Sequence, residues 1–234
     1  MKKIGIIAAM NEEMQEIKNI MSNIEEKNIY NLRFYIGIIE NRECVLVECG
    51  IGKVNAARTT QILIDNFQVE FIVNIGTAAS TIDKLNITDV VIGKRLVQHD
   101  FDITAFGHEK GYITGIGRFI NSDENLLKKC EDVMNYIDTD NSYNVHVGTI
   151  ASGDLFCTDK KVADNIYKEF GAICVEMESA AVAQICMLDN IPFIIIRSIS
   201  DTPNGNNNID FDEYLKIASK RGAHFLKEFV KKQG

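Results

Sequence analysis

The sequence lacks several features that mark common classes of protein. No stretch of 18 apolar residues occurs in its 234 residues, so we expect no transmembrane helix. Positive charge is not in excess, since Lys and Arg total 25, Asp and Glu total 33, and the formal net charge is −8. This balance argues against nucleic acid or an anionic membrane as a partner.

The cysteines also lack the spacing of a metal or redox site, because no CxxC pair occurs. Reduced and mostly buried thiols are therefore the simplest interpretation, and they favour a cytoplasmic protein without a metal site. The apolar run that follows Lys2 and Lys3 ends at Asn11, which is too short for a signal peptide. The six cysteines are Cys44, Cys49, Cys130, Cys157, Cys174 and Cys186.

Short apolar runs alternate with amphipathic segments along the whole chain. The runs predict strands at 3–9, 30–39, 44–49, 71–75, 89–97, 145–151, 172–175 and 193–196. The amphipathic segments predict helices at 11–21, 54–67, 123–136, 159–170, 179–188 and 211–231, and a glycine-rich loop at 107–120. With no internal repeat or linker, we expect one domain over residues 1–234. Its predicted α/β fold is a three-layer α/β/α sandwich with a central twisted, mixed, mostly parallel sheet.

Acidic residues follow two of the predicted strands. Glu176 and Glu178 come directly after the strand at 172–175, and Asp201 ends the segment that begins at Phe193 and contains Arg197. Ligands bind at such strand ends in open α/β sheets, and a buried acid there needs a compensating partner. The alternative is that Glu176 and Glu178 only begin the next helix, where negative charge suits the helix dipole.

Glu13 has a comparable position, in the first turns of the helix that follows the N-terminal strand. If the strands that precede Glu13, Thr77 and Asp201 are neighbours, these side chains and Arg197 meet at one edge of the sheet. Two carboxylates on either side of a small ligand suit the cleavage of a glycosidic bond. One activates water, and the other protonates or hydrogen-bonds the leaving group.

The segment Gly50-Ile-Gly-Lys53 stands between a predicted strand and a predicted helix, where phosphate loops occur. It lacks the third glycine of a dinucleotide fingerprint, and Val54 stands where a Walker loop has Ser or Thr. The glycines favour instead a close backbone approach at a strand-to-helix turn.

Two other segments have weak signals for a ligand site. Gly76-Thr-Ala-Ala79 predicts a turn of small residues that either presents backbone N–H groups to a ligand or packs tightly. His99, Asp100 and Asp102 alternate as metal ligands sometimes do, but a solvated loop is the preferred interpretation, and no metal site is predicted.

Eight short segments, in order, carry a resemblance that extends over essentially the whole chain. Each alone is a weak signal, but together they resemble the 5′-methylthioadenosine/S-adenosylhomocysteine nucleosidases of the nucleoside phosphorylase/hydrolase superfamily. The resemblance implies a nucleoside phosphorylase-like fold and a hydrolase that needs no cofactor. The segments are Ile4–Glu13, Gly50–Ala57, Asn74–Ala78, Asp100–Gly107, Ser152–Phe156, Val175–Ala181, Arg197–Asp201 and Phe211–Tyr214.

The activity that the resemblance implies is hydrolysis of the N-glycosidic bond of 5′-methylthioadenosine and S-adenosylhomocysteine, with 5′-deoxyadenosine as a further substrate. The products are adenine and the 5-thio-substituted ribose, in methionine salvage and methyl-cycle recycling. By the same resemblance, Glu13 matches the general base for the attacking water, assisted by Thr77 and Arg197. Asp201 matches the residue that hydrogen-bonds or protonates adenine N7, and Ser200 orients it.

The resemblance also implies the contacts that hold the substrate. Phe156 stacks on the purine, and the backbone of Cys157 reads its edge. Met177 and Glu178 contact the ribose, and Glu176 belongs to the wall on the adenine side. The remaining implied substrate contacts are Ala78 beside the base, Met10, Ile51 and Phe211 at the alkylthio end, and Ile103 and Phe106, which reach the neighbouring subunit's site in a homodimer.

The chain departs from the family pattern at a few positions. Cys157 stands where an aliphatic residue is expected, although readout by its backbone should survive this change. Ala79 and Ser80 replace a glycine pair, and Asn11 replaces an acid beside the base.

Three alternative functions stay open at this point. A purine nucleoside phosphorylase would place an arginine near Asn74 for phosphate, and Arg197 alone would hold a dianion poorly. A futalosine or aminodeoxyfutalosine hydrolase would share the base and ribose contacts. A non-catalytic adenosine-binding module is disfavoured, because it would have little use for both Glu13 and Asp201.

Overall fold

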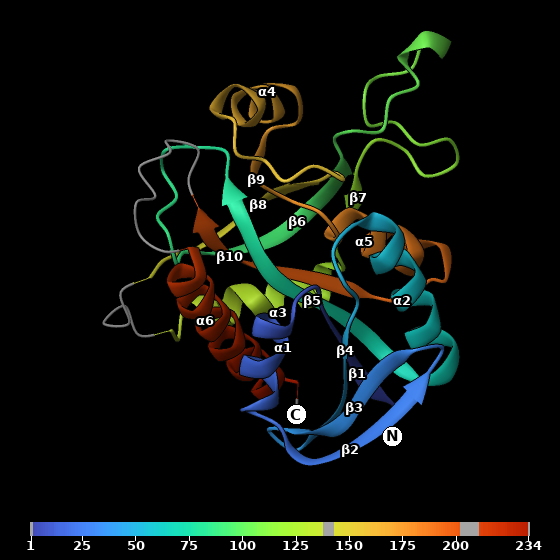
Figure 1. Cartoon of the computed structure of the whole chain (residues 1–234), viewed down its shortest axis with the longest axis vertical. Helices are drawn as coiled ribbons and strands as arrows, with labels where there is room; N and C mark the ends of the chain where they lie inside the picture. The colour runs from blue at the N-terminus through green and yellow to red at the C-terminus, as the bar shows by residue number, and fades with distance from the viewer. Residues whose placement is uncertain (1, 138–142, 202–210, 234) are drawn as a thin grey trace.

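A computed structural model describes residues 2–137, 143–201 and 211–233, with the side chains of 211–213 left out (Figure 1). Its strands are β1 Lys3–Ala8, β2 Ser22–Ile29, β3 Leu32–Ile39, β4 Arg42–Glu48, β5 Val69–Ser80, β6 Val90–Gln98, β7 Ile120–Asn121, β8 Val145–Ser152, β9 Ala172–Glu176 and β10 Phe193–Asp201. Its helices are α1 Asn11–Lys18, α2 Lys53–Asn66, α3 Glu124–Met134, α4 Lys160–Phe170, α5 Ser179–Leu188 and α6 Phe211–Lys231, with a 3₁₀ turn, η1, at Thr104–Phe106.

The central strand of the sheet is β5. It pairs in parallel with β1 on one side and with β10 on the other, which fulfils the condition for Glu13, Thr77 and Asp201 to meet at one edge of the sheet. Beyond β1 come β4, β3 and β2, and beyond β10 come β6, β8 and β9. The end of β5 also pairs with β9, so β5, β10, β6, β8 and β9 close into a ring. The sheet is mixed, because parallel pairs such as β1–β5 and β6–β8 occur beside antiparallel pairs such as β3–β4 and β10–β6.

Helices cover both faces of this sheet (Figure 1). Helices α1, α3 and α6 pack on one face, which Ile4 and Ile6 of β1 enter. Helices α2 and α5 pack on the other face, which Ile7 enters, because successive residues of a strand point to opposite sides. A smaller apolar cluster joins α4 to β8 and β9. The predicted three-layer α/β/α sandwich is therefore confirmed, whereas the extent of the domain over residues 1–234 stays a prediction.

The boundaries of α1 and the start of the second strand differ from the predictions. Met10, not Asn11, is the N-cap residue, and the helix ends at Lys18 rather than near Met21. Residues 22–29 form β2, which the sequence analysis missed because the strand is exposed along almost its whole length and shows no apolar alternation. The tight turn into β3 lies at Tyr30 and Asn31, both with positive φ.

Two strands also continue further than predicted. Residues 76–79 do not form a turn, because β5 runs through them to Ser80 in register with β10. β10 in turn runs beyond 196 to Asp201. The small residues at 76–79 reflect close packing between neighbouring strands rather than a change of direction. The segment 107–120, predicted as a loop, ends at the short strand β7, which pairs with β6.

The cysteines and the lack of a long apolar helix can both be compared with the predictions from the sequence. All six cysteines are free and buried, which agrees with the predicted thiols. Within the described ranges, no helix has the length and apolar character needed to span a membrane.

Candidate functional site

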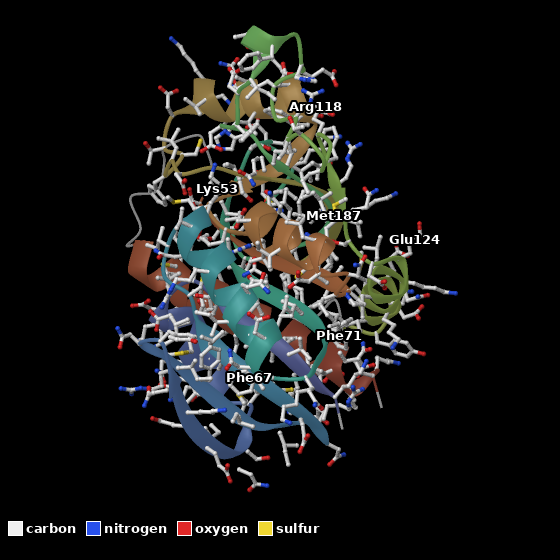
Figure 2. All side chains as sticks on the ribbon, turned by 90° about the vertical axis from the view of Figure 1, so that its right-hand side faces the viewer. Lys53, Phe67, Phe71, Arg118, Glu124 and Met187 are labelled. Atoms are coloured by element: carbon white, nitrogen blue, oxygen red, sulfur yellow. The ribbon has the colours of Figure 1, made fainter. Side chains whose placement is uncertain are left out.

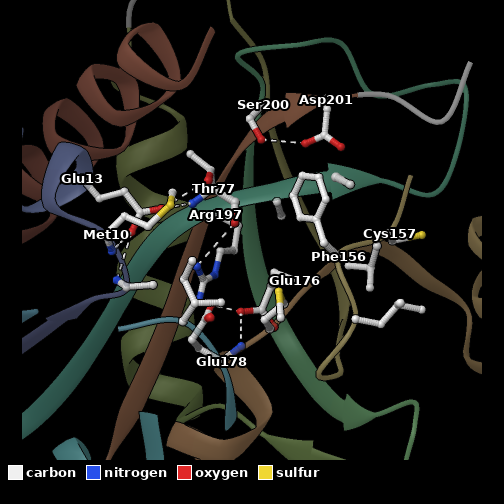
Figure 3. Close-up of a pocket in the computed structure, with 17 residues that line it drawn as sticks. Met10, Glu13, Thr77, Phe156, Cys157, Glu176, Glu178, Arg197, Ser200 and Asp201 are labelled. Carbon is white, nitrogen blue, oxygen red and sulfur yellow. Dashed lines mark hydrogen bonds and ion pairs between the residues drawn. The ribbon is translucent and has the colours of Figure 1, made fainter. Parts of the chain in front are cut away.

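A cavity opens at the carboxyl ends of the central strands (Figure 3). β1, β5, β9 and β10 all end at its walls, as expected for a ligand site in an α/β sheet. Of the predicted site residues whose side chains are described, all line it except Ile103 and Phe106. The lining residues are Ala9, Met10, Glu13, Ile51, Thr77, Ala78, Ala79, Leu155, Phe156, Cys157, Val175, Glu176, Met177, Glu178, Arg197, Ser200 and Asp201.

Glu13 is only 3% exposed and is held by hydrogen-bond donors on both carboxylate oxygens. Oε2 accepts from the backbone N–H groups of Ala9 at 3.0 Å and Met10 at 3.1 Å. Oε1 accepts from the backbone N–H of Thr77 at 2.8 Å and from its hydroxyl at 3.2 Å. Burial raises the pKa of Glu13, although Arg197 and these N–H groups oppose the rise. The carboxylate is thus fixed in place and more basic than an exposed one.

Arg197 is fully buried between β5 and β10. Its guanidinium lies 2.6 Å from a carboxylate oxygen of Glu176 and 3.7 Å from one of Glu178. It also donates to Asn74 Oδ1 at 2.6 Å and to the Ser179 hydroxyl at 2.9 Å. Burial acts to lower the pKa of Arg197, but the surrounding carboxylates outweigh it and raise the pKa. The charge of Arg197 is therefore largely balanced by carboxylates of the protein itself.

Glu176 is bound on all sides by the protein and holds its neighbours in place. It accepts from the backbone N–H of Glu178 at 3.0 Å and from that of Ser179 at 2.9 Å. It also accepts from the hydroxyls of Ser152 and Ser179. Together with the ion pair to Arg197, these contacts leave Glu176 little capacity for a ligand. The geometry makes it the support for the segment that carries Met177 and Glu178.

Glu178 differs from Glu176 because one of its oxygens has few partners. Oε1 accepts from the backbone N–H of Gly52 at 2.9 Å, while Oε2 stands 3.7 Å from Arg197. Burial and the nearby charge of Glu176 raise its pKa to about 7, against the opposing effect of Arg197. This carboxylate retains acceptor capacity toward the cavity.

Asp201 lies at the far end of β10, on the other side of the cavity from Glu13 (Figure 3). Within the described part of the chain, it accepts one hydrogen bond, from the Ser200 hydroxyl at 2.7 Å. Burial raises its pKa, and the Ser200 bond only partly opposes the rise. A raised pKa suits a group that donates a proton to a ligand.

The outer wall of the cavity is apolar. The side chains of Ile51, Leu155 and Phe156 are 54%, 49% and 59% exposed, respectively, although all three line the cavity. Cys157 is 9% exposed and directly follows Leu155 and Phe156 on the loop between β8 and α4. In Figure 3 the Phe156 ring stands between Asp201 and the glutamates. An aromatic face at this position suits a flat heterocycle.

Two predicted site residues with described side chains, Ile103 and Phe106, are not part of the cavity in this chain. Phe106 lies in η1 and is 81% exposed, and Ile103 immediately precedes that turn. Their predicted contact with a neighbouring subunit stays a prediction. Phe211 begins α6, but its side chain lies outside the described part of the chain.

Several residues that support the site were missed in the sequence analysis. Asn74 and Ser152 lie within apolar strands, and Ser179 opens α5. All three are buried and bind Arg197 or Glu176. A polar side chain inside a buried strand needs a hydrogen-bond partner. The position of Asn74 within the apolar run Phe71–Ile75 could therefore have identified it as a residue that supports the site.

The charges around the cavity restrict what it can bind. Of the described lining residues, Arg197 is the only cation, and it already faces three glutamates. A phosphate dianion would therefore meet carboxylates and no free positive group. Among the described residues, no cluster of three or more His, Cys, Asp or Glu side chains has the arrangement of a metal site.

Comparisons with known proteins agree with this geometry. The model of the phosphorylase superfamily matches residues 3–231. A 5′-methylthioadenosine/S-adenosylhomocysteine nucleosidase of Listeria monocytogenes is 41% identical over 230 residues, covering 97% of this chain and 98% of that protein. The nucleosidase of the same name from an Exiguobacterium species is 38% identical over 231 residues, which cover 98% of each protein.

Solved structures show the same likeness in three dimensions. The nucleosidase of S. pneumoniae, solved with a transition-state inhibitor, has a TM-score of 0.92 and 37% identity, covering 99% of this chain and all of that one. A futalosine hydrolase of Helicobacter pylori has a TM-score of 0.91 and 35% identity, over 98% and 97% of the two chains. On the strength of these full-length matches, the chain belongs to the 5′-methylthioadenosine/S-adenosylhomocysteine nucleosidase family of the phosphorylase superfamily.

Proposed function

We propose that the protein hydrolyses the N-glycosidic bond of 5′-methylthioadenosine and S-adenosylhomocysteine, and also that of 5′-deoxyadenosine. The observation that carries the proposal is the pair of carboxylates on opposite sides of one cavity. Glu13 is held by fixed donors beside Arg197, and Asp201 has a raised pKa and a single partner. The products would serve methionine salvage and the recycling of the methyl cycle.

In this proposal Glu13 activates the nucleophile. A water molecule between Glu13 and the anomeric carbon gives its proton to the carboxylate as its oxygen bonds to that carbon. The Thr77 hydroxyl lies 3.2 Å from the Glu13 carboxylate and would help to orient the water. Because burial raises the pKa of Glu13, the carboxylate is a stronger base than an exposed glutamate.

Asp201 acts on the leaving base. As the bond from the anomeric carbon to N9 breaks, electron density moves into the adenine, and a proton on N7 neutralises it. Protonated Asp201 would supply that proton, with the Ser200 hydroxyl fixing its orientation. The Phe156 ring would stack on the purine, and the backbone of Cys157 would read its edge.

The ribose lies between these two groups in the proposed complex. Glu178 would accept from the 2′ and 3′ hydroxyls, and Met177 would pack against the sugar. The sugar becomes positively charged in an oxocarbenium-like transition state, so the carboxylates of Glu13 and Glu178 stabilise it. Ala78 would border the base, and Ile51, Met10 and Phe211 would contact the 5′-alkylthio group.

Water is a better nucleophile for this site than phosphate. The charge of Arg197 is already paired with Glu176, and its guanidinium also donates to Asn74 and Ser179, which leaves it poorly suited to bind a dianion. The decisive experiment measures adenine release from 5′-methylthioadenosine with and without phosphate. We expect free 5-methylthioribose at the same rate in both buffers, and a ribose 1-phosphate product would identify a phosphorylase instead.

A futalosine hydrolase is a second candidate. The structure of such an enzyme from Helicobacter pylori superposes with a TM-score of 0.91. The two functions would share Glu13, Asp201 and Glu178, and they differ in the group attached at the 5′ position of the ribose. Parallel assays with 5′-methylthioadenosine and aminodeoxyfutalosine distinguish them by their kcat/KM values.

The proposal includes a cytoplasmic homodimer without a cofactor. Phe106 is 81% exposed on η1, and Ile51 and Phe156 are more than half exposed at the cavity mouth. An apolar surface of this kind suits a second subunit, which would place Ile103 and Phe106 against its partner's cavity. Free, buried cysteines suit the reducing cytoplasm.

A further inference from the structure

Lys53 lies at the N-terminal end of α2, where its side chain is 15% exposed (Figure 2). Its ammonium group donates to Asp100 Oδ1 at 2.5 Å and lies 3.9 Å from Asp154 Oδ2. Its backbone N–H donates to Asp154 Oδ1 at 2.9 Å. The backbone N–H of Asp154 donates in turn to Asp100 Oδ2 at 2.9 Å. We call Lys53, Asp100 and Asp154 the Lys53 cluster.

The Lys53 cluster connects three segments that are far apart in the sequence. Asp100 follows β6, Lys53 opens α2, and Asp154 lies in the loop after β8. Burial acts to raise the pKa of Asp100, but Lys53 and the Asp154 N–H outweigh it and lower the pKa. The aspartate therefore stays ionised at neutral pH, and the ion pair with Lys53 persists.

Two of these three segments, the loop before α2 and the loop after β8, form much of the cavity's outer wall. Ile51 precedes Lys53 by two residues, and Leu155 and Phe156 directly follow Asp154. Between Ile51 and Lys53, the backbone N–H of Gly52 donates to Glu178 Oε1 at 2.9 Å. Lys53 thus directly follows Gly52, the residue whose N–H binds Glu178, the proposed ribose carboxylate.

The same contacts explain the phosphate-loop-like segment 50–53. Its N–H groups at the start of α2 point to carboxylates of the protein, with Gly52 bound to Glu178 and Lys53 bound to Asp154. Gly52 has φ of +100°, and an added Cβ would stand 3.2 Å from Asp154 Oδ1. The glycine therefore permits a close approach to an internal anion, so the segment serves the cavity rather than a phosphate ligand.

We propose that Lys53 is a positioning residue that, through Asp100 and Asp154, holds the Ile51 and Phe156 loops and the Gly52 bond to Glu178 in place for substrate binding. The inference rests on the proposed function, because it assigns Glu178 to the ribose and Phe156 to the base. Neither Glu13 nor Asp201 contacts the cluster. The cluster therefore acts on binding of the nucleoside more than on the chemical step.

The test compares Lys53→Met with Lys53→Arg, which keeps the charge, and with Lys160→Met as the matched control. Lys160 also pairs with aspartate, at 3.6 Å from Asp164, but it lies on α4. With 5′-methylthioadenosine, we expect Lys53→Met to raise KM about tenfold, with kcat within about threefold, since a charge-assisted hydrogen bond is lost. Lys53→Arg should recover most of the affinity, and Lys160→Met should match the wild type.

A second measurement needs no substrate. Backbone hydrogen exchange in the ligand-free protein should accelerate at 50–54 and 154–157 in Lys53→Met, but not in Lys160→Met. Unchanged exchange in Lys53→Met would overturn the proposal, as would a fall in kcat without a rise in KM. Equal impairment in Lys53→Arg and Lys53→Met would also overturn it. If the wild type released no adenine at all, the proposed function would fail while the exchange experiment still tested the cluster.

Discussion

The two ends of the cavity hold their carboxylates in different ways. Glu13 is 3% exposed, accepts four hydrogen bonds and lies beside a buried arginine. Among the described residues, Asp201 accepts a hydrogen bond from the neighbouring Ser200 alone, and no arginine or lysine is a cause of its pKa shift. The pKa of both carboxylates is raised by burial, but only that of Glu13 is also held down by a cation.

This difference indicates different tasks. A carboxylate surrounded by fixed donors keeps its position and its charge, which suits a base that must receive a proton from water at one point. A carboxyl group with a single partner and a raised pKa is protonated more readily, which suits a donor to the leaving base. The same chemical group, a carboxyl group, thus acquires two roles from its surroundings.

The largest expected effect comes from removing these groups one at a time. Glu13→Gln and Asp201→Asn should each lower kcat by roughly 10²- to 10⁴-fold, since positioned acid–base groups contribute about this much. Both variants should still bind the substrate through Phe156 and Glu178. Steady-state kinetics and an inhibitor-binding assay would check both statements, with an unchanged kcat in either variant contradicting its role.

The comparison becomes sharper with a better leaving group. A nucleoside whose base departs without protonation of N7 needs Asp201 less, so Asp201→Asn should regain much of its lost rate on that substrate. Glu13→Gln should not recover, because the water still lacks its base. The same degree of recovery in both variants would show that the two ends of the cavity do not have separate roles.

The next largest effect concerns the arginine beside Glu13. Arg197→Met would leave Glu13, Glu176 and Glu178 buried without a cation, so we expect a loss of about 3–5 kcal/mol in the free energy of unfolding. Arg33→Met is a suitable control, because Arg33 is 61% exposed and its ion pair to Glu26 spans 3.8 Å. Urea unfolding of both variants would check the difference. Equal stability losses would mean that Arg197 does not stabilise this cluster.

The pH dependence should reveal Glu178. Because its pKa is raised to about 7, it becomes protonated below neutrality and loses acceptor capacity for the ribose. We expect kcat/KM for the nucleoside to fall about tenfold per pH unit below that point, because the ionised fraction of Glu178 falls by the same factor. A profile that stays flat between pH 5 and 7 would contradict the assignment of Glu178 to the ribose.

Stability should change in the opposite direction over the same range. The folded pKa of Glu178 lies above its ordinary value of 4.5, so the folded state binds the proton more tightly than the unfolded state. Its contribution to stability is therefore complete below pH 4.5 and is lost as the pH rises through about 7. Glu178→Gln should remove this slope in thermal unfolding curves measured across the range.

The smallest expected effect is at the exposed 3₁₀ turn. Phe106→Ala should weaken the dimer and raise KM by a factor of a few, because burying one aromatic side chain at an interface contributes on the order of 1–3 kcal/mol. Sedimentation of the wild type and the variant, with kinetics at matched concentrations, would check both. A fully active wild-type monomer would reject the idea.

The sequence predicted the centre of the molecule better than its margins. Strand β1, which precedes Glu13, and strands β5 and β10, which contain Thr77 and Asp201, include apolar runs, as buried parallel strands usually do, and these runs were predicted as strands. Their adjacency, on which the shared site depended, was assumed in the sequence analysis and is observed in the structure. Strand β2 was missed because its side chains face solvent on both sides. Such a strand is determined by its pairing with β3, a partner that local periodicity does not reveal.

Within the site, residue types were easier to predict than their partners. Acidic residues at the ends of apolar strands were visible in the sequence. The hydrogen bonds that separate their roles join residues far apart in the chain, as with Asn74 and Arg197 or Ser152 and Glu176. The Lys53 cluster shows the same limit, since Lys53 and Asp100 meet only after the chain has folded.

Gly76 lies directly opposite Arg197 in the register of β5 and β10. A Cβ atom added to it would stand 2.1 Å from a guanidinium nitrogen and 2.9 Å from Glu13 Oε1. No larger residue fits while the arginine and the glutamate keep their places. In evolution, the residue that is tolerated at position 76 therefore depends on the side chain at position 197. A larger residue at position 76 could therefore be accommodated only after Arg197 and Glu13 had changed their positions.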